Sequence, residues 1–307
     1  MKKNALTRIP VILAIVLFMM SCSTDEPTVA VKKKARSFEE LAFENYRRGD
    51  METSIYYFEK ALEWDQSVNN LQGMASNLHN IARCYVNLGL YENARKLLSE
   101  AVEINNNTGN SSGRGDNLVL LATISTAQGE YAAALDLLQK SYDLYAEDKN
   151  KKGMATALNN MGSIYLKQGK YEQALQAIDD AISMHRKEKN HAGLAAAYNN
   201  MGYLYELTDR GDRAIEFYLR ALEEDKFIEN SLGISSNLHT IAEFYKNTGD
   251  FENALFYYKR ASEVNRRLNL TNRLKDDLNN IIDILSSRGR EEEKKIYEKA
   301  LRELEGV

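Results

Sequence analysis

The apolar residues of the chain recur at helical spacing, in pairs of stripes separated by a glycine. One stripe consists of Leu158, Met161, Gly162 and Tyr165, at positions i, i+3, i+4 and i+7. The next stripe consists of Tyr171, Ala174, Leu175, Ile178, Ala181 and Ile182. Each stripe predicts an amphipathic α-helix, because residues at this spacing share one helical face. Gly169 lies between them and predicts the end of the first helix, since glycine tolerates the left-handed backbone found there.

This pattern returns with a period of 40 residues. Glycine marks one register, at Gly49, Gly89, Gly129, Gly169, Gly249 and Gly289. A second glycine register contains Gly73, Gly113, Gly153, Gly193 and Gly233, and an alanine register contains Ala61, Ala101, Ala181, Ala221 and Ala261. No proline follows Pro27, so no proline interrupts the later helices. The sequence therefore predicts an all-α chain of about seven helical hairpins, which bury their stripes by stacking on one another.

Asparagine marks a further register, at Asn70, Asn110, Asn150, Asn190 and Asn230. These residues follow the second stripe of each unit. Asparagine is, after glycine, a residue that readily adopts the left-handed conformation. We therefore expect Asn150 and Asn190 to end the second helices in that conformation.

The repeated residues resemble the signature of the tetratricopeptide repeat. The family carries a large residue, Leu-Gly and Tyr on the first helix, followed by Tyr, Ala, an apolar residue and Ala on the second. The fifth unit of this chain reads Tyr198, Met201-Gly202, Tyr205, Gly211, Ala214, Tyr218 and Ala221. The resemblance covers residues 37–307 and implies a right-handed α-solenoid superhelix. The small residue at Gly162 and Gly202 is expected to let the second helix approach closely.

The usual repeat is about 34 residues long, so this chain has a longer form. The longer form resembles the class found in kinesin light chains, spindle adaptors and bacterial peptide-pheromone receptors, which bind peptides or proteins. The resemblance therefore implies a non-catalytic protein that binds a protein or peptide segment and acts as a scaffold. The alternative is a sensor or carrier of a small ligand, a peptide signal or a cell-wall fragment.

In this family, the fifth, sixth, ninth and thirteenth positions of the repeat line a concave groove. Asparagine recurs there, and its amide can both donate to and accept from a peptide backbone. The residues expected to contact a partner are Asn80, Arg83, Asn159, Asn160, Ser163, Lys167, Asn199, Asn200, Tyr203, Glu243, Asn247 and Asn280. The alternative is that the asparagines bond between helices or only face solvent. The lysines of the carboxylate-clamp chaperone adaptors are replaced by Thr156, Ala196, Ser236 and Asp276, which argues against a chaperone tail as partner.

The N-terminus resembles the signal peptide of bacterial lipoproteins. Lys2, Lys3 and Arg8 precede an apolar run over residues 9–20, and a run of this length is too short to span a bilayer. Ser21 and Cys22 then resemble the end of a lipobox. The resemblance implies cleavage of residues 1–21, acylation of Cys22 by fatty acids such as palmitate, and a flexible tether over residues 22–36. The expected location is the bacterial outer membrane, facing the periplasm; a plain signal peptide is the alternative.

Charge and composition argue against most chemistry. The net charge of −4 lacks the basic surplus of a nucleic-acid-binding protein. The four histidines have no metal-ligand spacing, and Cys84 occupies a position that is a large apolar residue in other units, which predicts a buried side chain. We therefore expect no enzyme activity, no metal and no cofactor.

Overall fold

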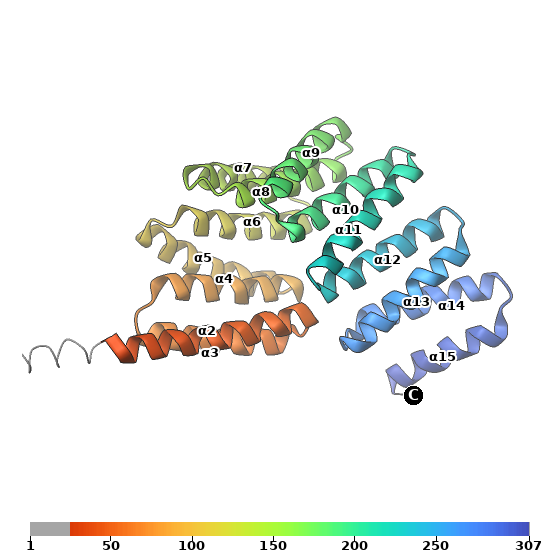
Figure 1. Cartoon of the computed structure of the whole chain (residues 1–307), viewed down its shortest axis with the longest axis horizontal. Helices are drawn as coiled ribbons and strands as arrows, with labels where there is room; N and C mark the ends of the chain where they lie inside the picture. The colour runs from red at the N-terminus through yellow and green to blue at the C-terminus, as the bar shows by residue number, and fades with distance from the viewer. Residues whose placement is uncertain (1–24, 307) are drawn as a thin grey trace, which may run out of the picture. The chain divides into compact units, whose positions relative to one another are not determined.

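The computed structural model describes residues 25–306, and these residues form fourteen α-helices and no β-strand (Figure 1). The helices are α2 (Asp25–Arg48), α3 (Met51–Ser67), α4 (Leu71–Asn87), α5 (Tyr91–Thr108), α6 (Ser111–Ala127), α7 (Tyr131–Glu147), α8 (Lys151–Lys167), α9 (Tyr171–Lys187), α10 (His191–Leu207), α11 (Gly211–Phe227), α12 (Ser231–Asn247), α13 (Phe251–Arg267), α14 (Thr271–Ser287) and α15 (Glu291–Glu305). The predicted signal peptide and Cys22 lie outside the described residues. No helix within residues 25–306 has the length and apolar character needed to cross a membrane.

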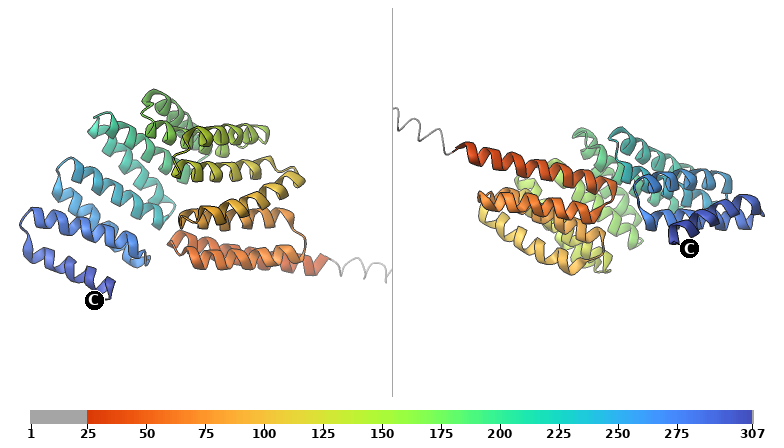
Figure 2. Two further views of the ribbon diagram at one scale, coloured as in Figure 1. Left: turned by 180° about the vertical axis from the view of Figure 1, so that it is seen from behind. Right: turned by 90° about the horizontal axis from the view of Figure 1, so that it is seen from below.

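The described residues form two compact units. The first contains residues 25–44 and 51–108, and the second contains residues 45–50 and 109–306. In the second unit, α6 pairs with α7, α8 with α9, α10 with α11, and α12 with α13, and each hairpin also contacts the next (Figure 2). The predicted all-α solenoid of helical hairpins is therefore confirmed.

A glycine ends the first helix of the α8–α9 hairpin. Gly169 has a φ of 71°, and its N–H donates to the Leu166 carbonyl at 3.0 Å. The Lys170 N–H donates to the Tyr165 carbonyl at 2.9 Å. These two bonds satisfy carbonyls at the end of α8, so the predicted role of Gly169 is confirmed.

The prediction for the asparagines between hairpins is wrong. Lys149 and Lys189 hold the left-handed conformation, with φ of 55° and 50°, whereas Asn150 and Asn190 have φ of −79° and −89°. The Asn150 Oδ1 atom accepts a hydrogen bond from the Gly153 N–H at 3.0 Å. Asparagine is therefore selected as the N-cap of the following helix, where its side chain satisfies an otherwise unpaired N–H.

Small residues bring the two helices of a hairpin together, as predicted. A Cβ atom at Gly162 would lie 2.5 Å from the Ile178 Cγ1 atom, and one at Gly202 would lie 2.7 Å from the Tyr218 ring. The second stripe differs from the prediction at Leu175, which is 44 % exposed. The helix turns this residue outward, while its neighbours in the stripe pack into the core.

The first unit repeats the same packing. Cys84 of α4 is fully buried, which confirms the prediction for this residue, and its Sγ atom lies 3.5 Å from the Ser54 Oγ atom. One difference concerns residues 25–36, where the sequence suggests a flexible tether but the structure has the first half of α2, with Ala35 buried. After Pro27, no proline or glycine interrupts this segment before Gly49, and its lysines, arginine and alanines favour a helix.

Candidate functional site

The residues predicted to contact a partner all lie on the first helices of hairpins. Asn80 and Arg83 lie on α4 in the first unit, and the others lie on α8, α10, α12 and α14 in the second. Asn80 is only 6 % exposed. The Arg83 guanidinium lies 5.8 Å from the centre of the Phe43 ring. Asn80 is therefore buried, and Arg83 is packed against an aromatic ring of its own unit.

Several of the asparagines connect neighbouring first helices. The Asn200 Nδ2 atom donates to the Asn159 Oδ1 atom at 2.9 Å, which joins α10 to α8. The Asn199 Nδ2 atom donates to the Asn237 Oδ1 atom at 2.7 Å, which joins α10 to α12. The Asn280 Oδ1 atom accepts from the Lys246 Nζ atom at 2.6 Å. These amides therefore form hydrogen bonds between helices, which is the alternative to contact with a partner. Their contact with a partner stays a prediction.

Three predicted residues come together in what we call the α6–α8 pocket, a cavity of about 280 Å³. Its lining residues are Val119, Ala122, Thr123, Thr126 and Ala127 of α6, Leu138 of α7, and Asn160, Ser163, Ile164 and Lys167 of α8. The Thr123 and Thr126 hydroxyls donate to carbonyls of their own helix, at 3.0 and 2.7 Å. Within the described part of the chain, the side chains of Asn160, Ser163 and Lys167 have no polar partner. The pocket thus combines an apolar wall with polar groups that can bind a ligand.

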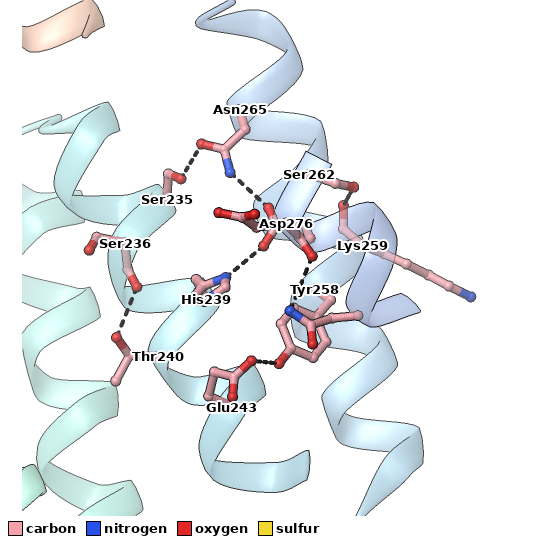
Figure 3. Close-up of polar contacts among 12 residues, drawn as sticks. Ser235, Ser236, His239, Thr240, Glu243, Tyr258, Lys259, Ser262, Asn265 and Asp276 are labelled. Carbon is pink, nitrogen blue, oxygen red and sulfur yellow. Dashed lines mark hydrogen bonds and ion pairs between the residues drawn. The ribbon is translucent and has the colours of Figure 1, made fainter. Parts of the chain in front are cut away.

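A second cavity, the α12–α14 pocket, has a volume of about 220 Å³. It is lined by Ser235, Ser236 and His239 of α12, Asn265 of α13, and Arg273 and Asp276 of α14. Figure 3 shows the hydrogen bond between Ser235 of α12 and Asn265 of α13, with His239 and Asp276 nearby. The pocket therefore depends on the stacking of two successive hairpins.

Two lining residues of the α12–α14 pocket are hydrogen-bonded to Asp277, whose carboxylate is fully buried. This carboxylate accepts from the His239 Nδ1 atom and from the Asn265 Nδ2 atom, both at 2.7 Å. The Ser235 hydroxyl in turn donates to the Asn265 Oδ1 atom, and the Tyr258 hydroxyl donates to Glu243 (Figure 3). The hydrogen bond to Asp277 raises the pKa of His239 above its usual value, because it stabilises the charged imidazolium.

Sequence reasoning missed this buried network, although the 40-residue period contains its signal. One position near the end of each second helix is polar or aromatic and buried: Asp65, Asn105, Tyr145, His185, Asp225 and Asn265. Asp225 accepts from Asn230 and from Asn237, both at 2.7 Å, and burial raises the pKa of its carboxyl. Asp225 thus connects α11 to the following first helix, α12.

The second glycine register provides space for these buried side chains. A Cβ atom at Gly193 would lie 2.4 Å from the His185 Cε1 atom, and one at Gly153 would lie 2.3 Å from the Tyr145 Cδ1 atom. Each of these glycines follows the buried side chain by eight residues. This spacing in the sequence therefore indicates a close contact between one hairpin and the next.

The described residues contain no group of histidine, cysteine, aspartate or glutamate side chains placed to hold a metal ion. Within the same residues, Cys84 is a free, buried thiol, and burial raises its pKa. The arrangement can bind a ligand through hydrogen bonds and apolar contacts, and we assign it no reaction.

Several solved structures share the fold. A Rap protein complexed with Competence and Sporulation Factor has a TM-score of 0.65 and 16% sequence identity, with 89% of this chain and 75% of that chain covered. Aspartyl phosphate phosphatase F from Bacillus subtilis has a TM-score of 0.60 and 15% identity, covering 94% and 74%. BtubC from P. vanneervenii has a TM-score of 0.51 and 20% identity, covering 78% and 92%. No curated protein matches the sequence significantly.

Models of one repeat family match the sequence directly. They are described as tetratricopeptide repeat and match residues 73–147, 153–224 and 235–267, which together make up more than half of the chain. The matched residues include every lining residue of the α6–α8 pocket. The chain therefore belongs to the tetratricopeptide repeat family.

Proposed function

We propose that this tetratricopeptide protein binds a peptide or protein segment on the first helices of its second unit, without catalysis. The α6–α8 pocket carries this proposal. Asn160, Ser163 and Lys167 line it with groups that have no partner among the described residues, next to an apolar wall. A peptide matches such a surface because it presents backbone polar groups and apolar side chains together.

The fold comparisons support a peptide as ligand. One similar structure is, by its title, a Rap protein complexed with Competence and Sporulation Factor. At 16% identity the likeness extends to the fold alone, so the proposal for this chain rests on its own pocket. Hairpins that stack side by side can hold a pocket of fixed shape, which reduces the entropy lost on binding.

A pull-down from native membranes tests this function. We expect the double variant Asn160→Ala with Lys167→Ala to lose a partner that the unchanged full-length chain retains. The matched control is Gln176→Ala on α9, which changes an exposed residue outside the pocket. Equal recovery of the same partner by the pocket variant would contradict the proposal.

We also propose that the protein is a lipoprotein that organises a complex in the bacterial envelope, anchored at the outer membrane and facing the periplasm. The support is the charged N-terminus, the apolar run and Cys22. Two or more acyl chains on one cysteine would hold a folded domain stably at a membrane.

Metabolic labelling with an alkyne-bearing fatty acid tests the lipid anchor. Cys22→Ala should abolish the label and release the protein from the membrane fraction. Cys84→Ala is the matched control, because it removes the other cysteine and should keep the label. Label retained in Cys22→Ala would refute acylation at this residue.

The second candidate function is that of a carrier or sensor of a small ligand. The α12–α14 pocket favours it, because polar side chains from three helices, among them the buried Ser235 and Asn265, line a cavity of about 220 Å³. Calorimetric titration of the protein with short peptides and with muropeptides distinguishes the two functions. Heat with muropeptides that is lost in Ser236→Leu would favour the carrier.

A further inference from the structure

The charge of the α6–α8 pocket is unusual for this acidic chain. Lys167 is its one charged lining residue, and no aspartate or glutamate lines it. Some lysines of the second unit pair with acidic residues: Lys140 pairs with Asp136 at 2.7 Å, and Lys246 lies 3.8 Å from Glu243. The Lys167 ammonium has no ion pair within residues 25–306. The pocket therefore attracts a negatively charged group.

Two more donors lie on the same face of α8 as Lys167. Asn160, Ser163 and Lys167 are spaced i, i+3 and i+7 and line the same cavity. The Asn160 amide and the Ser163 hydroxyl make no hydrogen bond with other described residues. An amide N–H, a hydroxyl and an ammonium can together donate to the two oxygens of a carboxylate.

The rest of the pocket lining is mostly apolar. Val119, Ala122 and Leu138 come from α6 and α7, and Ile164 comes from α8. The cavity of about 280 Å³ lies at the lower limit of small-ligand pockets, which begin at about 300 Å³. It therefore holds one end of a longer ligand, with room for a single apolar side chain.

We propose that the α6–α8 pocket binds the C-terminal carboxylate of a peptide or protein whose last side chain is apolar. This inference rests on the proposed function and specifies which part of the segment enters the pocket. The Asn160 Oδ1 atom supplies an acceptor for the N–H of the last residue, which a fatty acid lacks. The chemistry thus favours a chain terminus over other carboxylates.

The helix dipoles oppose an anion here, but they are the weaker effect. The pocket includes Ala127 and Lys167, the last residues of α6 and α8, where the dipole is negative. That effect contributes about 0.3–1 kcal/mol near an exposed helix end. At the end of α8 the turn already satisfies the Tyr165 and Leu166 carbonyls. The attraction of the Lys167 ammonium and the hydrogen bonds from two neutral donors therefore exceed the remaining repulsion between the helix ends and an anion.

The proposed site differs from that of the carboxylate-clamp adaptors. Those proteins carry lysines at positions where this chain has Thr156 and Ala196. Here the ammonium comes from the thirteenth repeat position and the neutral donors from the sixth and ninth. The chain would thus bind a terminus with a different set of side chains.

Saturation-transfer NMR on the mature protein in detergent micelles tests the proposal. The probes are the peptides Gly-Ser-Gly-Ala-Leu and Gly-Ser-Gly-Ala-Val with an acetylated N-terminus, each as the free acid and as the C-terminal amide. We expect the acids to bind at least about tenfold more tightly than the amides, since hydrogen bonds to a charged group are lost. Added salt should narrow the difference, because an exposed ammonium is screened.

Variants of Lys167 distinguish binding in the pocket from general attraction of the peptide to positive charge on the surface. Lys167→Gln should remove the preference for the acid, and Lys167→Arg should keep most of it. The matched control is Lys170→Gln, which removes a neighbouring exposed charge that does not line the pocket.

Three results would overturn the proposal. Equal binding of acid and amide would show that the pocket does not take a terminus, while leaving peptide binding intact. Equal effects of Lys167→Gln and Lys170→Gln would place the charge effect outside the pocket. Absence of transfer to every probe would also reject the site, and the pull-down of the pocket variant would then decide the proposed function separately.

Discussion

Replacing Asp277 by alanine should weaken the structure around the α12–α14 pocket by about 3 kcal/mol. The buried Asp277 carboxylate accepts from His239 and Asn265 at 2.7 Å. A hydrogen bond to a charged group contributes about 1.5–3 kcal/mol, and burying the carboxylate costs several kcal/mol. Removing one member of such a network costs about 3–5 kcal/mol, because the other members stay desolvated. The lower value applies because the His239 side chain is 38% exposed.

Urea unfolding combined with hydrogen exchange measures this effect. The free energy of unfolding should fall, and the loss of exchange protection should concentrate in residues 231–287. Asp276→Ala is the matched control, because it removes the adjacent carboxylate, which is exposed; we expect a change within about 0.5 kcal/mol. A loss below about 1 kcal/mol in Asp277→Ala, or equal losses in both variants, would refute the reasoning.

The same network predicts a pH dependence. The Asp277 hydrogen bond raises the pKa of His239 in the folded protein, and the Glu243 and Asp276 charges act in the same direction. The resulting stabilisation is complete below the unfolded histidine pKa of about 6.5 and is lost as the pH rises through the folded value. Unfolding of the unchanged protein and of His239→Gln should therefore differ most at low pH and converge above that value. Parallel profiles would contradict the assignment.

Two further predictions concern the hairpins and their turns. Gly162→Leu should lower the free energy of unfolding by about 3 kcal/mol or more, because its Cβ would already lie 2.5 Å from Ile178; unchanged urea unfolding would show that the helices can separate without cost. Asn150→Ala should cost about 1 kcal/mol through loss of the cap on the Gly153 N–H, whereas Lys149→Gly, at a φ of 55°, should stabilise the protein by a similar amount. Equal melting temperatures for these two turn variants would contradict the account of the turn.

The sequence predicts the hairpins well because their determinants are local and repeated. Gly169 ends a helix through its own backbone freedom, and Gly162 meets a residue 16 positions later in the same hairpin. The same residue type recurs at these positions every 40 residues, so the pattern is easily distinguished from chance. Fold class and turn positions follow from such registers.

The role of the asparagine register could not be read from residue preferences alone. Both the left-handed end of one helix and the N-cap of the next favour asparagine, and these positions are adjacent in the chain. The structure separates them at Lys149 and Asn150. The glycine three residues after each asparagine was the available signal, because its N–H is the group that the cap satisfies.

The candidate site was predicted only in part. Asn160, Ser163 and Lys167 share a helix face, so their spacing brings them together. The bond between Asn200 and Asn159 depends instead on how two hairpins stack, which a single sequence does not specify. The same holds for Asp277, whose partners lie 12 and 38 residues away.

Site-specific photo-crosslinking tests the central claim most directly. A benzophenone amino acid is placed at Thr123, which lines the α6–α8 pocket without belonging to its donor set, or at exposed Gln176 on α9, in the full-length chain within its native membranes. The account predicts a discrete adduct from position 123, mapped by mass spectrometry to one protein or peptide segment, and none from position 176. Identical adducts from both positions, or none from position 123, would contradict it.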